Sequence, residues 1–243
     1  SVLWCGFITD ITARKASENK IERLAFFDDL TGLPNRRLLM DRLQSAMLTS
    51  VRHKESGALL FIDLDNFKDL NDTQGHDVGD VLLQRVGERL VGCVRAVDTV
   101  ARLGGDEFVV MLAELDAARD EAAAQAESVG RKILAVLNQP YEFDGVEHHS
   151  TPSIGVALFH DSGQSVEALR KRADLAMYQA KAAGRNTLSF FDPSLQAKLN
   201  RRLVLEAELN DAVAKGEFVL HYQAQVGKDM GLTGVEALVR WNH

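Results

Sequence analysis

Cysteine is scarce in this chain. The two present, Cys5 and Cys93, lie far apart and lack the spacing of metal ligands. We therefore expect neither a disulfide framework nor a cysteine-based metal site, but buried or half-buried thiols in a reducing compartment. Clustered basic charge is also missing, because 28 Lys and Arg stand against 35 Asp and Glu, giving a formal net charge of −7. This balance argues against a general binder of nucleic acid or of anionic membranes.

Long apolar runs are absent as well. The longest, such as Ala58–Ile62, are far too short to cross a bilayer, and the N-terminus shows no charged-then-apolar signal pattern. We expect a cytoplasmic protein without direct membrane contact in this segment, although a region upstream of it could carry a membrane anchor. What is present, 46% apolar and 26% charged residues, is typical of a soluble globular protein with a sizeable core.

Strand-like and helix-like segments alternate through the middle of the chain. The continuous apolar run Ala58–Ile62 suits a strand that is covered on both faces. Two short apolar runs flank Gly104-Gly105-Asp106-Glu107 and predict a β-hairpin. Further strands are predicted at 153–159 and 187–191, and helices at 36–51, 78–94, 117–137 and 166–183. The alternation predicts an α/β or α+β sandwich around a central sheet.

Three carboxylates stand out by their positions. Asp63 ends a predicted strand, and Asp106 and Glu107 lie in the hairpin turn. A strand end and a neighbouring turn can bring such groups close together, where they repel unless a cation lies among them, and oxygen ligands favour Mg²⁺. The two glycines before Asp106 permit a tight turn with room for a ligand. The alternative is that Asp63 caps a turn and the glycines form an ordinary hairpin loop.

The hairpin does not stand alone. Several ordered segments together resemble the GGDEF family of diguanylate cyclases over about residues 28–191, namely Asp28–Arg36 (DDLTGLPNR), Phe61–Asp80 (FIDLDNFKDLNDTQGHDVGD), Arg102–Phe108 (RLGGDEF) and Ala180–Asn186 (AKAAGRN). The resemblance implies a palm-like nucleotidyl-cyclase fold, with a mixed, mainly antiparallel five-stranded sheet flanked by helices. It also implies an enzyme that condenses two GTP into cyclic di-GMP and releases pyrophosphate.

The same resemblance implies a metal site and a catalytic set. Asp63, Asp106 and Glu107 would hold Mg²⁺, or Mn²⁺, with help from the Leu64 carbonyl. Glu107 would assist deprotonation of the attacking 3′-hydroxyl, and Asp106 and Lys68 complete the catalytic set. The metal would lower the pKa of that hydroxyl and neutralise charge at the α-phosphate.

Phosphate contacts are implied for Lys68, Lys181 and Arg185. The alternative for each is a solvated surface cation, which is the usual state of Lys. Lys181 and Arg185 are four residues apart at a helix end, so a shared anion is plausible.

Guanine recognition is implied for Asn71 and Asp80, with Phe67 and His76 completing the substrate-binding set. Guanine offers N1–H and N2–H₂ donors that a carboxylate can accept, whereas adenine presents an acceptor at N1. The alternative for Asp80 is an acid that stabilises a helix N-terminus.

Arg95-Ala96-Val97-Asp98 resembles the RxxD product-inhibition site of the family. Arg95 would bind phosphate or guanine and Asp98 would accept from guanine donors. The alternative is a solvated ion pair of little energetic value. Catalysis would require a homodimer, because the product joins two GTP molecules and one set of metal ligands positions only one. A linker helix at 13–27 would bring two copies together.

The flanks resemble parts of two other domains. The start of the chain resembles the end of a PAS domain, and Phe218–Trp241 the opening of an EAL phosphodiesterase domain with Glu236 as metal ligand and Gln223 and Arg240 as substrate contacts. We do not expect hydrolysis by this segment, which lacks the other ligands of that domain. The rival function is a GTP- or cyclic-di-GMP-binding module without turnover. The predicted organisation is PAS remnant 1–12, linker helix 13–27, GGDEF domain 28–191, linker helix 192–215 and EAL fragment 216–243.

Overall fold

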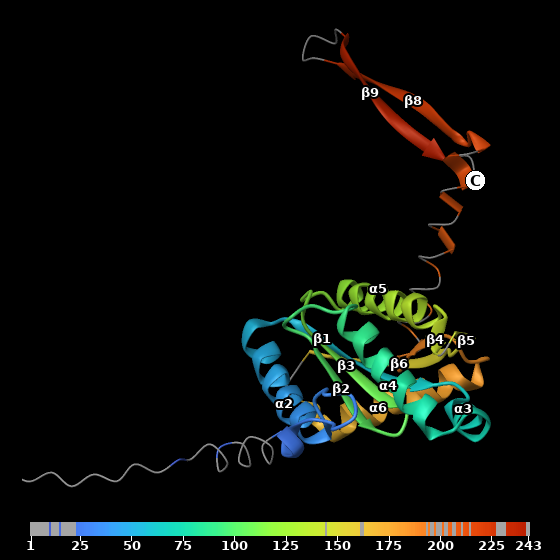
Figure 1. The fold of residues 1–243 in the computed structure, drawn as a ribbon. Helices are drawn as coiled ribbons and strands as arrows, with labels where there is room; N and C mark the ends of the chain where they lie inside the picture. Colours follow the sequence, from blue (N-terminus) through green and yellow to red (C-terminus); the bar gives the residue numbers. More distant parts are fainter. Residues whose placement is uncertain are drawn as a thin grey trace, which may run out of the picture. The chain divides into compact units, whose positions relative to one another are not determined.

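The chain forms two units, Ser1–Pro193 and Ser194–His243 (Figure 1). No helix among the described residues is long and apolar enough to span a membrane. The computed structural model describes residues 23–143, 145–160, 163–192, 215–226 and 232–241, with isolated positions at 10, at 15 and between 194 and 213.

Five strands make the central sheet of the first unit, in the order β2-β3-β1-β6-β7. Neighbouring strands run antiparallel except β6 and β7, which are parallel, so the prediction of a mixed, mainly antiparallel five-stranded sheet is confirmed. The middle strand β1 is buried along its whole length, as its continuous apolar sequence predicts. The bounds are β1 Ser56–Leu64, β2 Thr99–Gly104, β3 Glu107–Leu115, β6 Pro152–Phe159 and β7 Leu188–Phe190.

Helices pack on both faces of this sheet (Figure 1). α2 and α6 cover one face, where their Leu and Met side chains meet Leu59 and Phe61 of β1. α5 covers the opposite face, with Gly130 close to Leu60, and α4 packs against α5 and β2. Because side chains alternate along a strand, Asp63 projects to the same side as Phe61, which is the α6 side. The bounds are α2 Arg36–His53, α4 His76–Val91, α5 Arg119–Leu137 and α6 Val166–Ala182.

Helix α6 lies directly against β6 at Gly155. A Cβ at this position would be 2.1 Å from the Ala173 carbonyl oxygen and 2.1 Å from the Met177 backbone nitrogen, so only glycine leaves space for the helix backbone. This contact fixes the position of α6 along β6. The last turn of α6, which carries Lys181, therefore lies at the end of β1.

Most strands and long helices predicted from the sequence are present with small shifts at their ends; α4, for example, spans His76–Val91 where 78–94 was predicted. Two features were not predicted. One is α3 (Phe67–Gln74), which has no buried residue, and the other is the hairpin of β4 (Tyr141–Phe143) and β5 (Val146–His148). Segments this short contain too few apolar positions to show a period.

The second unit contains a hairpin of β8 (Phe218–Val226) and β9 (Leu232–Trp241), the strand pair predicted at this end of the chain. Its open end is held by Phe218, which stacks on Trp241 with 6.0 Å between ring centroids. Of the predicted PAS remnant 1–12, only residue 10 is described. In the predicted linker helix 13–27, the described residues 15 and 23–26 are helical. In the predicted linker helix 192–215, the described positions between 194 and 213 and residue 215 are helical.

Candidate functional site

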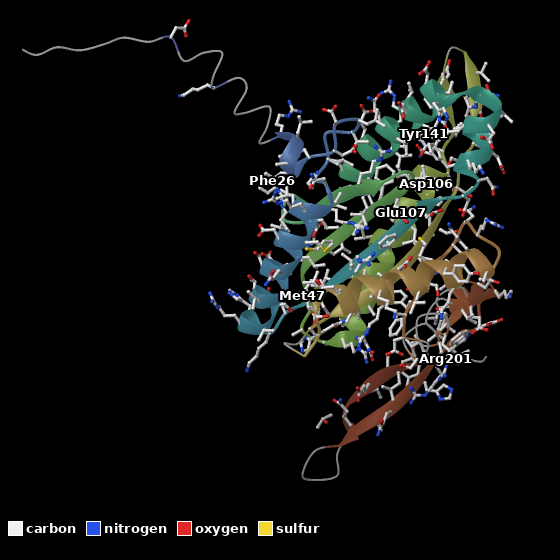
Figure 2. All side chains as sticks on the ribbon, turned by 90° about the horizontal axis from the view of Figure 1, so that it is seen from below. Phe26, Met47, Asp106, Glu107, Tyr141 and Arg201 are labelled. Atoms are coloured by element: carbon white, nitrogen blue, oxygen red, sulfur yellow. The ribbon has the colours of Figure 1, made fainter. Side chains whose placement is uncertain are left out.

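The end of β1 and the turn between β2 and β3 share one edge of the sheet. Because β1 pairs with β3, Asp63 lies directly opposite Glu107. Asp106 precedes Glu107 in the chain, and the two lie together at this edge (Figure 2). Gly104 and Gly105 make this turn with φ values of 135° and 54°, and no other atom lies within 4 Å of where their Cβ atoms would be. The glycines therefore provide the backbone conformation and also leave open space beside the carboxylates.

Asp63 lies in a crowded charge environment. Its side chain is 11% exposed, and the Nζ of Lys181 lies 2.6 Å from its Oδ1. Burial raises the pKa of Asp63, the charges of Asp106 and Asp65 raise it further, and the Lys181 ammonium only partly offsets them. One lysine therefore does not fully compensate the ionised Asp63, and a cation of higher charge would stabilise it further.

The Leu64 backbone faces the hairpin. The Asp65 N–H donates to the Thr151 carbonyl on the β6 side at 2.7 Å. Because successive backbone groups of a strand point to opposite neighbours, the Leu64 carbonyl points toward β3. The ladder between β1 and β3 ends at the Asp63–Glu107 pair, so this carbonyl lies beside the hairpin turn.

This donor set suits a hard divalent cation, since carboxylates and a backbone carbonyl are ligands that Mg²⁺ accepts. The carboxylates are not gathered around one position, however: among the described residues, no three His, Cys, Asp or Glu side chains are arranged to hold an ion. Lys181 occupies the contact position on Asp63 instead. The donor atoms thus fit Mg²⁺ only if it would replace Lys181 at Asp63, and the ligand set Asp63, Leu64, Asp106 and Glu107 stays a prediction.

We expect Asp63→Asn to raise the melting temperature of the metal-free protein. Because the folded-state pKa of Asp63 is raised, the folded protein binds this proton more tightly than the unfolded chain does, and ionised Asp63 opposes folding at neutral pH. The amide has the same shape without the charge. The gain should vanish as the pH falls through the folded-state pKa, where Asp63 itself is protonated. Thermal melts at neutral and acidic pH test this, and a less stable variant at neutral pH would contradict it.

Two of the three predicted phosphate-binding cations lie at the end of α6. Lys181 is in its last turn, and Arg185 follows in an exposed turn with a φ of 62°, in the left-handed region. The Lys68 side chain is exposed on α3, and its ammonium makes no hydrogen bond or ion pair with other described residues. The structure therefore joins Lys181 to Asp63 but does not join Lys68 to that pair.

The predicted guanine-binding residues lie where α3 meets α4. A Cβ at Gly79 would be 1.9 Å from Asn71 Oδ1 and 3.2 Å from Phe67 Cζ, so this glycine makes room for both side chains. Asn71 Oδ1 is buried and has no hydrogen-bond partner among the described residues, which suits a ligand that donates a hydrogen bond. Asp80 and His76 are exposed on α4.

An ion pair that the sequence analysis missed braces the hairpin turn. Arg102 Nη1 donates to both carboxylate oxygens of Asp28 at 2.9 and 3.1 Å, and its Nε and Nη2 donate to the Gly105 carbonyl at 3.0 and 2.7 Å. Burial pushes the pKa of Asp28 up, but hydrogen bonds from Thr31 and the Arg102 charge outweigh it and lower the pKa. Arg102 thus ties the loop before α2 to the turn that carries Asp106. Both segments belong to the family resemblance, which was the available signal.

Arg95 and Asp98 do not form the ion pair considered as the alternative. Asp98 Oδ2 accepts from the Arg95 backbone N–H at 2.8 Å, and its Oδ1 accepts from the Ala113 N–H at 3.1 Å. The Arg95 guanidinium is exposed and has no hydrogen bond or ion pair within the described part of the chain. Both residues line a cavity of about 360 Å³ that also includes Lys132.

In the second unit, Gln223 of β8 lies directly opposite Glu236 of β9. Arg240 follows four residues later on the same face of the hairpin. All three side chains are exposed. The hairpin therefore gathers the three predicted EAL residues on one surface.

This chain is similar in sequence to several known proteins. Residues 25–187 match the family described as diguanylate cyclase, GGDEF domain. The bifunctional diguanylate cyclase/cyclic di-GMP phosphodiesterase MucR of Pseudomonas aeruginosa is 43% identical over 233 residues, which are 96% of this chain and 33% of that protein. The cyclic di-GMP phosphodiesterase PdeR of Escherichia coli is 34% identical over 96% of this chain and 34% of its own length. The chain thus spans about a third of the length of these relatives.

Solved structures share the fold. The crystal structure of the GGDEF domain of YfiN or TpbB from Pseudomonas aeruginosa has a TM-score of 0.62 at 39% identity, covering 66% of this chain and 97% of that one. The coiled coil and GGDEF domain of DgcB from Caulobacter crescentus, in complex with c-di-GMP, has a TM-score of 0.65 at 27% identity, covering 74% and 93%. The family match includes strands β1, β2 and β3 and the Gly-Gly-Asp-Glu turn beside Asp63, and the solved structures share the fold of the sheet. The chain therefore belongs to the GGDEF family of diguanylate cyclase domains.

Proposed function

We propose that this chain condenses two molecules of GTP into cyclic di-GMP and releases pyrophosphate. The observation that carries the proposal is the contact between Asp63 and Lys181 at the edge that also holds Asp106. Carboxylates in need of a cation and an ammonium able to bind phosphate share one site. A nucleoside triphosphate bound together with a metal ion would satisfy both, because the carboxylates would bind the metal and Lys181 would bind the phosphates.

The residues of the sheet edge hold the metal and the reacting hydroxyl in this proposal. Asp63, Asp106, Glu107 and the Leu64 carbonyl would bind Mg²⁺, or Mn²⁺ in its place, and Glu107 would also assist deprotonation of the attacking 3′-hydroxyl. When bound, the metal lowers the pKa of that hydroxyl and offsets charge at the α-phosphate. The position of Glu107 opposite Asp63 supports this role.

The helical residues bind the rest of the nucleotide. Lys181 moves from Asp63 to the phosphates, where Lys68 and Arg185 add positive charge. Asn71 and Asp80 read the Watson–Crick edge of guanine, with Phe67 and His76 beside them. The unpaired Oδ1 of Asn71 supports this assignment, since guanine supplies N–H donors.

Inosine triphosphate provides a sharp test of guanine recognition, because its base keeps N1–H but lacks the 2-amino group of guanine. We expect GTP to be used at least about tenfold better than inosine triphosphate, and ATP not to be used, since a site built for hydrogen bonds rejects analogues that lack them. Asp80→Ala and Asn71→Ala should each reduce the preference for GTP. Equal kcat/KM for GTP and inosine triphosphate would contradict the assignment.

Two copies of the chain must act together in this reaction. One sheet edge positions one GTP, and the product contains two. We therefore propose a homodimer in which two sites face each other, each supplying one activated hydroxyl and one α-phosphate. The complex of DgcB with c-di-GMP supports recognition of this product within the family.

We expect product inhibition through the Arg95 guanidinium, which is exposed and unpaired in the described part of the chain. Arg95→Ala should keep the uninhibited rate but lose about tenfold or more in sensitivity to added cyclic di-GMP, because a bidentate arginine contact discriminates by roughly 1–3 kcal/mol. Asp98 is less suitable for the test, since its carboxylate closes the turn itself. Initial rates with and without product measure the effect, and equal sensitivity of the two proteins would reject the site.

The proposal also assigns the two flanking segments to domains. We propose that 1–12 ends a PAS domain and that 216–243 opens an EAL domain. The match to MucR over 96% of this chain supports the second assignment, as does the shared face of Gln223, Glu236 and Arg240. The phosphodiesterase names of some relatives favour the rival function, a nucleotide-binding module that regulates an EAL partner without turnover. Product formation from GTP separates the two.

A further inference from the structure

Asp65 is a buried carboxylate that the proposed function leaves without a role. It is 8% exposed and follows Asp63 by two residues. Its Oδ1 accepts from the Ser153 hydroxyl at 2.7 Å, and its Oδ2 accepts from the Thr151 hydroxyl at 2.7 Å and from the Asn186 backbone N–H at 3.1 Å. The carboxylate thus binds three groups of the protein and joins the end of β1, the start of β6 and the turn after α6.

That turn has an unfavourable backbone. Gly184, Arg185 and Asn186 have φ values of 115°, 62° and 45°, so three successive residues lie in the left-handed region, two of them with side chains. Such a conformation persists only where surrounding contacts hold it. Here the Asn186 N–H is bound by Asp65, and the Asn186 side-chain oxygen accepts from Asn138 Nδ2 at 2.9 Å. The Arg185 N–H ties the turn to α6, because it donates to the Ala180 carbonyl at 3.1 Å, whereas the bonds of Asn186 tie the turn to the end of β1 and to Asn138.

We infer that Asp65 is a positioning residue that holds the phosphate-binding end of α6 against the metal-binding end of β1. The inference rests on the proposed function. The contact between Lys181 and Asp63 also joins these two ends, but binding of metal and phosphate would break it. The bond from Asn186 to Asp65 involves neither a metal ligand nor a phosphate ligand, so it can persist in both states and keep Arg185 aimed at the phosphates.

The choice of variants follows from the hydrogen bonds. In Asp65→Asn, the amide oxygen can still accept from Asn186, while the amide N–H₂ donates to the Ser153 hydroxyl, which rotates to accept. In Asp65→Ala, the Asn186 N–H loses its acceptor, so the left-handed turn keeps its backbone bond to α6 but loses its bond to the end of β1. Thr151→Val removes one hydrogen bond from the same carboxylate without touching Asn186, and serves as the matched control.

The test measures how much the triphosphate adds to nucleotide affinity. Isothermal titration calorimetry of the full chain with Mg²⁺ compares GMP with a GTP analogue that carries a methylene bridge between the α and β phosphorus atoms. The preference is the ratio of the affinity for the GTP analogue to the affinity for GMP. This ratio should fall at least about tenfold in Asp65→Ala and in Arg185→Ala, because each variant loses a charge-assisted phosphate contact. Asp65→Asn and Thr151→Val should keep the preference, and GMP affinity should not change. The double variant Asp65→Ala/Arg185→Ala should lose no more than Arg185→Ala alone.

The outcomes separate this inference from the proposed function. A wild-type protein that binds the analogue no better than GMP contradicts the triphosphate site itself and the inference with it. If the preference for the triphosphate falls in Arg185→Ala but is unchanged in Asp65→Ala, the triphosphate site stands and only the positioning role of Asp65 is overturned. If Asp65→Ala does not fold, Asn138→Ala takes its place, because it loosens the same turn without touching the buried carboxylate. Its preference should fall, and an unchanged preference would overturn the inference.

Discussion

Asp106→Asn and Glu107→Gln are each expected to lower the synthesis of cyclic di-GMP by at least about a thousandfold while the fold persists. Each change removes a charge at the proposed metal and proton-transfer site, where such interactions stabilise the transition state strongly. Both side chains are half-buried at the edge of the sheet, and the replacements keep their volume, so no cavity forms. The measurement is the initial rate of product formation from GTP with Mg²⁺.

The melting temperature provides a second readout for the same variants. The charge of Asp106 raises the pKa of Asp63, so its removal relieves repulsion and should leave the metal-free protein at least as stable as the wild type. Asp41→Asn, at an exposed carboxylate on α2, is the matched control and should leave both rate and stability unchanged. Full activity in the two site variants would show that the site is assigned wrongly.

Loss of the ion pair between Asp28 and Arg102 should have the largest effect on the free energy of unfolding. The two side chains are 21% and 10% exposed, so Asp28→Asn leaves a nearly buried guanidinium without its charge partner. We expect a loss of about 3 kcal/mol, or roughly 6–12 °C in melting temperature for a protein of this size. The whole of this decrease in stability should be seen at neutral pH. It should shrink as the pH falls below the ordinary carboxyl pKa of about 4 and through the lowered folded-state pKa of Asp28, because the wild type then loses the same contribution.

Two further variants show what this brace does for the hairpin. Arg85→Ala is the control, because the ion pair of Arg85 with Glu88 is 60% and 65% exposed and should contribute little. The double variant Asp28→Leu/Arg102→Met replaces the pair by apolar groups and should recover much of the stability. It should not recover full activity, since the bonds from Arg102 to the Gly105 carbonyl are gone. Full recovery of both would mean that the brace does not position the turn.

The strands that carry the site can be predicted from the sequence because their patterns are local. Ala58–Ile62 is apolar without interruption because helices cover both faces of β1. Gly104 and Gly105 provide the positive φ values that a tight hairpin needs. The antiparallel pairing then places Asp63 opposite Glu107. A strand end and a turn were therefore enough to predict that these carboxylates lie at one edge.

The contacts that position the site cannot be predicted in this way, because they join residues far apart in the chain. Arg102 and Asp28 are 74 positions apart, and Asn186 and Asp65 are 121 apart. Asp63 and Asp65 look equivalent in the sequence Asp-Leu-Asp. Packing alone decides that Asp63 meets Lys181 while Asp65 meets the hydroxyls of β6 and the turn after α6.

The most direct test of the proposed function is the incubation of the purified chain with GTP and Mg²⁺, followed by chromatography and mass spectrometry. The account predicts cyclic di-GMP and two pyrophosphates for each molecule formed, with no product when Mg²⁺ is withheld or when Asp106 is replaced by Asn. Binding of GTP without any cyclic di-GMP, at every protein concentration tried, would contradict the account and favour a regulatory module that binds nucleotide without turnover.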